Sequence, residues 1–145
     1  HSVVRRQRQM CIRDRACSNP KMNSRLKQIP ERFEQVKNYI QSKNLESLGR
    51  LLEEEALEMH RIAETSSPPI QYLSEDSRNV IHALQNCPGR DFFFTIDAGP
   101  NIHVISQRPV KEDLEKLLSP IVPDLQLWED EGGFGPRFEK GPFNE

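Results

Sequence analysis

The sequence predicts an α+β fold in which a small antiparallel sheet is backed by helices. Two segments between residues 29 and 63 carry apolar residues at helical spacing, and two strand-like segments follow at 91–97 and 102–107. The four residues AGPN between those strands suit a hairpin loop. The expected order is helix, helix, helix, strand, strand, helix, strand. A sheet of three short strands is thin, which suggests that an upstream strand is missing.

The bulk composition limits the classes of function. A chain of 145 residues suits one domain, and a net charge of −2 argues against a general nucleic-acid binder. No apolar run approaches the roughly 20 residues of a membrane span, and the first residues contain no run typical of a signal-peptide h-region. Cys11, Cys17 and Cys87 lack metal-like spacing, so we expect free thiols in a cytoplasmic protein.

The first residues, HSVVRRQRQMCIRDR, differ from the rest of the chain. They are rich in arginine, have no clear period and contain no aromatic residue. A basic arm that binds polyanions is one interpretation, and a non-native leader such as translated cloning sequence is the favoured one. We therefore expect a non-native or disordered leader at 1–20, a folded domain at 21–140 and a tail at 141–145.

Two helices are expected to form an antiparallel hairpin. Order is predicted from about Ile29, with Pro30 in the first turn of a helix. Its inward residues are expected to be Ile29, Phe33, Val36 and Ile40. Asn44 can cap the second helix. The stripe of that helix comprises Leu45, Leu48, Leu52, Ala56, Met59 and Ala63, with Glu53, Glu54 and Glu55 mostly facing water.

Helix-capping residues, prolines and side-chain alternation predict the elements after residue 65. SSPPI at 66–70 must be extended because prolines stop helices, and Ser74 can cap a third helix. Pro109 can begin a fourth helix, and DLQLW at 124–128 alternates as a last strand. The residues expected to face inward are Val80, Ile81, Leu84, Val110, Leu114, Leu117 and Leu118, and Leu125 and Leu127 are expected to share one face of the last strand.

The stretch FFFTIDAGPN places a carboxylate, Asp97, at the end of the most hydrophobic segment. Apolar surroundings raise the free energy of an ionised carboxylate and make it a better base. Gly99 would let a ligand approach the backbone, and Asn101 can both donate and accept hydrogen bonds. The residues alone favour a simpler interpretation, in which Asp97 and Asn101 stabilise the turn.

Three further residues are candidates for a site. His60 lies on the flank of the second helical stripe, where it is either a packed histidine or part of a substrate pocket. Ser66 and Ser67 could contact a phosphate, although serines before prolines are also ordinary loop residues.

A resemblance to a known family changes the balance between a turn role and a functional role for Asp97. FTIDAGPN at 94–101 resembles the signature of the mevalonate diphosphate decarboxylases of the GHMP kinase superfamily. EALEMH at 55–60, SSPPIQYL at 66–73 and GFGPRF at 133–138 are similar to other segments of that family. DAGPN is fairly specific and the other segments are supportive. The resemblance covers about residues 20–140.

The resemblance implies a ferredoxin-like C-terminal domain and a role in isoprenoid biosynthesis. Family members use ATP and Mg²⁺ to convert mevalonate 5-diphosphate into isopentenyl diphosphate, ADP, phosphate and CO₂, as carboxy-lyases. The aspartate of the DAGPN motif is the family's proposed base, so the resemblance implies that role for Asp97. We also expect substrate contacts for His60, Gly99, Asn101, Ser66 and Ser67, and the resemblance supports that role for His60.

The superfamily's Gly/Ser-rich phosphate loop has no counterpart in this sequence. The resemblance therefore implies that ATP and Mg²⁺ are bound mainly by an N-terminal GHMP domain of the same parent chain. We expect this chain to be the C-terminal half of the enzyme, inactive alone, with a homodimer of the parent left open. The alternatives are a decarboxylase or kinase for mevalonate phosphate or mevalonate, and a non-catalytic ferredoxin-like binding module.

Overall fold

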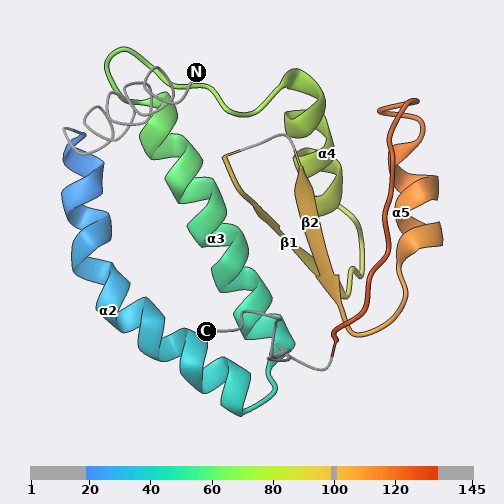
Figure 1. Ribbon diagram of the computed structural model, residues 1–145, viewed down its shortest axis with the longest axis horizontal. Helices are drawn as coiled ribbons and strands as arrows, with labels where there is room; N and C mark the ends of the chain where they lie inside the picture. The colour runs from blue at the N-terminus through green and yellow to red at the C-terminus, as the bar shows by residue number, and fades with distance from the viewer. Residues whose placement is uncertain (1–18, 99–100, 134–145) are drawn as a thin grey trace, which may run out of the picture.

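The computed structural model describes residues 19–98 and 101–133, with helices and strands in the predicted α+β arrangement. The elements are α2 (Pro20–Gln41), α3 (Leu45–Glu64), α4 (Glu75–Gln85), β1 (Phe92–Ile96), β2 (Ile102–Ser106) and α5 (Lys111–Leu118). In Figure 1, α3 lies between α2 and the β1–β2 hairpin, while α4 and α5 lie on the other side of the hairpin. Most of the predicted leader, the tail at 141–145, Cys11, Cys17 and Gly99 fall outside the described residues.

Helix α2 begins earlier than the sequence suggested. We expected order from about Ile29, but the helix begins at Pro20 with Asn19 as its N-cap. The Asn19 side chain accepts a hydrogen bond from the backbone N–H of Lys21 at 3.0 Å. Its amide donates to the carbonyl of Ile62 and to the hydroxyl of Thr65, each at 2.9 Å. One buried asparagine thus caps α2 and ties it to the end of α3.

Pro30 lies inside α2 and not in its first turn, which corrects our expectation. A proline inside a helix removes one backbone hydrogen bond and clashes with the preceding turn. Figure 1 shows that α2 bends in its middle. We predicted Pro30 in the first turn because a proline destabilises a helix least at that position. Pro20 takes that position instead, ten residues earlier.

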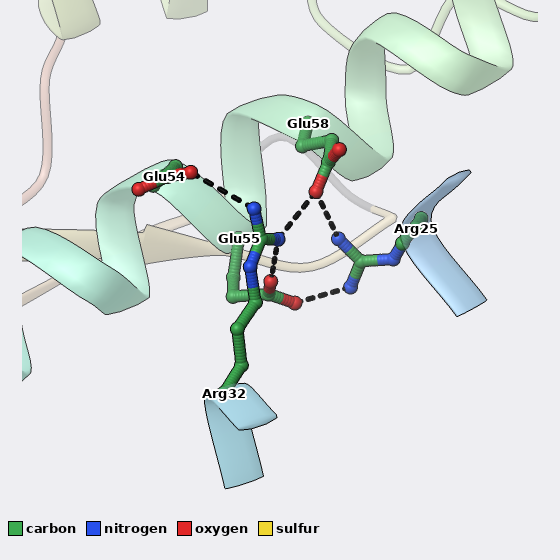
Figure 2. A network of polar contacts seen from close by, with 5 residues as sticks. All are labelled: Arg25, Arg32, Glu54, Glu55 and Glu58. Atoms are coloured by element: carbon green, nitrogen blue, oxygen red, sulfur yellow. Dashed lines mark hydrogen bonds and ion pairs between the residues drawn. The ribbon is translucent and has the colours of Figure 1, made fainter. Parts of the chain in front are cut away.

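The antiparallel pairing of α2 with α3 is confirmed, but ion pairs line the contact (Figure 2). Arg25 donates to the carboxylates of Glu55 and Glu58, the latter at 3.0 Å. Arg32 donates to Glu54 at 2.9 Å and also to Glu55 and Glu58. Both arginines are largely buried, with 16% and 14% of their side chains exposed. The apolar residues predicted to bury this helix, notably Phe33 and Ile40, are exposed instead.

Helix α3 packs directly on β1 through a glycine. A Cβ atom built on Gly49 would lie 2.0 Å from Cγ of Phe93, so no larger residue fits without movement of one element. The predicted stripe of α3 is therefore rotated. Its buried face comprises Gly49, Leu51, Glu53, Ala56, His60, Ile62 and Ala63, whereas Met59 is 42% exposed.

The hairpin and its hydrophobic core match the predicted alternation. β1 and β2 are antiparallel, with Phe94 opposite Val104 and Ile96 opposite Ile102. Phe92, Phe94 and Ile96 belong to one core cluster with α4 and α5. The other members are Leu73, Val80, Ile81, Leu84, Val110, Leu114 and Leu118. Ser74 caps α4 as predicted, by accepting from the N–H of Ser77 at 3.0 Å.

The strand predicted at 124–128 does not form, so the described sheet has two strands. The alternation itself is correct, because Leu125 and Leu127 pack against the core while Trp128 is 88% exposed. A strand also requires a neighbour that offers backbone hydrogen bonds. Side-chain alternation indicates which residues are buried, but it does not indicate whether a neighbouring strand is present.

Candidate functional site

Asp97 follows the last residue of β1, at the mouth of the hairpin loop. Ile96 and Ile102 form the final pair of the sheet, so Asp97 and Asn101 lie at the two ends of the loop. Both are exposed, and Asp97 makes no hydrogen bond or ion pair with any of the described residues. The apolar surroundings that we expected around this carboxylate are not supplied by the described part of the chain. An exposed carboxylate is free to receive a ligand but is still hydrated.

The strand that carries Asp97 is held in place by a buried ion pair. Glu53 accepts hydrogen bonds from Arg90 at 2.6 and 2.9 Å, and from the backbone N–H of Phe94 at 3.1 Å. Only 8% of the Glu53 side chain and 17% of the Arg90 side chain are exposed. The hydrogen bond to Glu53 raises the pKa of Arg90 further above its usual value, despite desolvation. This contact fixes the position of β1 along the axis of α3.

The sequence analysis missed Glu53, which was predicted to face water. A helical signal was present, because Gly49, Glu53 and Ala56 share one face at spacings of four and three. A glutamate inside a glycine- and alanine-lined face has to be paired. Its partner, Arg90, lies 37 residues away along the chain, where no local pattern could identify it.

His60 occupies the same buried face of α3, one turn beyond Ala56. Only 3% of it is exposed, and its ring meets Tyr72 edge to face with centroids 6.0 Å apart. Its Nε2 atom has no hydrogen-bond partner among the described residues. Buried polar atoms of folded proteins nearly always have a partner. His60 therefore has an unused hydrogen-bonding position that the described residues enclose.

Ser66 and Ser67 differ in their surroundings. The Ser66 hydroxyl is buried, 2.7 Å from the carbonyl oxygen of Ala63 and 3.1 Å from that of Pro68. It has one proton to donate, so it serves to close the end of α3. Ser67 precedes a cis peptide bond to Pro68 and is exposed. Of the two serines, Ser67 is the one whose side chain is available to a ligand.

The structure brings His60, Asp97 and Asn101 to the same end of the fold. Gly49 contacts Phe93 and Glu53 binds Phe94, so α3 and β1 run in the same direction. From Glu53 to His60 the helix rises about 10 Å. From Phe94 to Asp97 the strand also advances about 10 Å. Figure 1 shows the end of α3, the segment after it, the end of β1 and the start of β2 at this end.

The described residues contain no cluster of three or more acidic, histidine or cysteine side chains that could hold a metal ion. No helix among them is long and apolar enough to cross a membrane. Cys87, the cysteine that the structure describes, is a free thiol as expected.

Curated relatives of this chain carry one name. The protein named diphosphomevalonate decarboxylase of Schizosaccharomyces pombe is 26% identical over 112 residues, which cover 74% of this chain and 28% of the relative. The protein of the same name from Candida albicans is 31% identical over 92 residues, 62% of this chain and 25% of the relative. The chain thus spans between a quarter and a third of the length of these relatives.

Solved structures of mevalonate diphosphate decarboxylases have a fold similar to that of this chain. A mevalonate diphosphate decarboxylase from Staphylococcus aureus is 31% identical, with a TM-score of 0.64 over 70% of this chain and 31% of that chain. The enzyme from Enterococcus faecalis is 27% identical, with a TM-score of 0.66 over 74% of this chain and 34% of that chain. The family model for the mevalonate 5-diphosphate decarboxylase C-terminal domain matches residues 12–132 of this chain. The chain therefore belongs to the family of mevalonate 5-diphosphate decarboxylase C-terminal domains.

Proposed function

We propose that this chain is the C-terminal part of an ATP-dependent decarboxylase that converts mevalonate 5-diphosphate into isopentenyl diphosphate, ADP, phosphate and CO₂. The observation that carries the proposal is the position of the DAGPN carboxylate. Asp97 is exposed at the end of a strand that a buried ion pair anchors three residues earlier. The family membership and the names of its relatives support the reaction.

In this proposal, Asp97 accepts the proton of the tertiary 3-hydroxyl of the substrate. A tertiary alcohol is a poor nucleophile, so a positioned base contributes typically 10²- to 10⁴-fold to the rate. A base of this kind works best when water is excluded. Because Asp97 is exposed in the described domain, we propose that the N-terminal GHMP domain of the parent closes over it.

The remaining residues at this end have supporting roles in the proposal. His60 is buried, so in this proposal it lines the substrate pocket from behind and offers its unpartnered Nε2 to a group that contacts the substrate. Ser67, Asn101 and the backbone at Gly99 bind polar groups of the diphosphate substrate, and Ser66 supports the loop that carries Ser67. We propose that ATP and Mg²⁺ bind mainly to the N-terminal domain. One solved relative is a complex with MVAPP, AMPPCP and magnesium. ATP supplies the phosphoryl group that makes the hydroxyl a leaving group.

A fusion tests this proposal. Residues 19–133 replace the corresponding segment of the Staphylococcus aureus enzyme, and release of phosphate and CO₂ is measured with ATP and Mg²⁺. We expect turnover of mevalonate 5-diphosphate, and Asp97→Asn should lower kcat about 10²-fold or more while the protein stays folded. Asp124→Asn, another exposed aspartate at a loop position, is the matched control and should retain full activity.

The same assay separates the alternatives. Preference for mevalonate 5-phosphate or mevalonate would assign the chain to a related decarboxylase or kinase. An active fusion whose Asp97→Asn variant keeps at least a third of its kcat would make Asp97 a turn residue. The 145-residue chain alone should give no turnover above the control without enzyme, because it has no glycine-rich phosphate loop. A cytoplasmic location stays a prediction.

A further inference from the structure

The face of the β1–β2 hairpin that carries Asp97 also carries a histidine, His103, that has no role in the proposed function so far. Thr95 of β1 lies directly opposite His103 of β2 in the antiparallel register. Directly opposite residues point to the same face of a sheet, and so do alternate residues of one strand. Thr95, Asp97 and His103 therefore share one face, and Asp97 is a diagonal neighbour of His103.

This spacing brings the imidazole of His103 within reach of a ligand at Asp97. Diagonal neighbours on a sheet lie about 7–8 Å apart, a distance that aromatic and long side chains can span. Helix α3 covers this face at β1, where Gly49 meets Phe93. It leaves the β2 side open, because His103 is exposed and Thr95 beside it is only half-buried. A ligand that contacts Asp97 therefore has access to His103.

His103 can supply a positive charge that this hairpin otherwise lacks. Residues 92–107 include no lysine or arginine, whereas Asp97 is an acid. An imidazole donates hydrogen bonds and can also carry a positive charge. Among the residues that the structure describes, no ion pair joins His103 to an acid. Its imidazole is therefore available to a ligand.

The substrate of the proposed reaction needs such a group beside Asp97. Mevalonate 5-diphosphate carries a carboxylate and a diphosphate, and an ionised base repels both. A hydrogen bond from a cationic donor to a charged oxygen is strong enough to offset such repulsion. We propose that His103 binds an anionic group of the substrate while Asp97 accepts the proton of the 3-hydroxyl. The inference rests on the proposed function and makes His103 a substrate-binding residue.

Substrate binding to the fusion with the Staphylococcus aureus enzyme tests the proposal. Titration calorimetry without ATP measures the dissociation constant of mevalonate 5-diphosphate, and release of phosphate and CO₂ gives KM and kcat. We expect His103→Leu to weaken binding about tenfold or more, as loss of a hydrogen bond to a charged group does, with kcat changed by less than about threefold. His103→Lys keeps a cationic donor and should bind within about threefold of the unmodified fusion.

His82→Leu is the matched control, because His82 is an exposed histidine of α4 and lies outside the hairpin. It should bind the substrate as the unmodified fusion does. If the fusion binds and converts the substrate, equal dissociation constants for His103→Leu and His82→Leu would overturn the inference and leave the proposed function intact. A folded fusion that binds no mevalonate 5-diphosphate would refute both.

Mevalonate 5-phosphate identifies the group that His103 binds. If His103→Leu weakens binding of the 5-phosphate and the 5-diphosphate by the same factor, the contact is to the carboxylate that both compounds carry. A larger loss for the 5-diphosphate assigns the contact to its terminal phosphate. In that case His103 also contributes to discrimination between the two compounds.

Discussion

Replacing Glu53 by alanine tests whether the buried ion pair sets the position of β1. The substitution leaves Arg90 with no carboxylate partner and removes the acceptor of the Phe94 N–H. Breaking one partner of a buried, hydrogen-bonded pair costs roughly 3–5 kcal/mol in unfolding free energy. Because 17% of the Arg90 side chain is exposed, we expect the lower end of that range.

Urea unfolding followed by far-UV circular dichroism measures this loss. Trp128 is exposed, so tryptophan fluorescence would respond weakly to unfolding. Glu46→Ala is the matched control, because its ion pair with Arg50 leaves 69% and 68% of the two side chains exposed. Such a surface pair contributes about 0.5 kcal/mol or less.

A double-mutant cycle decides between pairing and simple packing. If the pair acts as a unit, Glu53→Ala combined with Arg90→Ala destabilises less than the sum of the single changes, since no charge is left unpaired. Additive losses, or a Glu53→Ala loss no larger than that of Glu46→Ala, would refute the reasoning. In the fusion, Glu53→Ala should also lower kcat, because Asp97 follows the strand that Glu53 holds.

Gly49→Ala should destabilise the domain by about 1–3 kcal/mol, because its Cβ would overlap the Phe93 ring, while Gly132→Ala, with open space around it, should change nothing in the same urea assay. Desolvation alone would raise the pKa of Glu58, but hydrogen bonds and charges from two arginines of α2 outweigh it, so the pKa is lowered. Its contribution to stability is therefore present above about pH 4.3 and lost as the pH falls below that value. Unfolding midpoints measured from pH 6 to pH 3 should fall less steeply in Glu58→Gln, and an equal slope would contradict this cause. His60→Phe should change stability by less than about 1.5 kcal/mol, since its Nε2 makes no hydrogen bond with the described residues, yet it should impair turnover in the fusion.

The sequence by itself determined the features that depend on nearby residues. Asn44 and Ser74 cap helices as predicted, because a cap needs a backbone N–H only two or three residues away. The alternation in β1 placed Phe92, Phe94 and Ile96 in the core, since successive side chains of a strand point to opposite faces. The DAGPN motif identified the candidate base and the family.

The tertiary structure decided the features that depend on distant partners. Pro30 is held inside α2 because Asn19 and the arginines bind residues of α3 that lie 22 or more residues away. Glu53 is buried because Arg90 and Phe94 meet it there. DLQLW forms no strand because no backbone segment between residues 19 and 133, as far as the structure describes them, pairs with it. The exposure of Asp97 was likewise set by packing. Helical and strand periods indicate which side of an element is apolar, but they do not indicate which other element packs against that side.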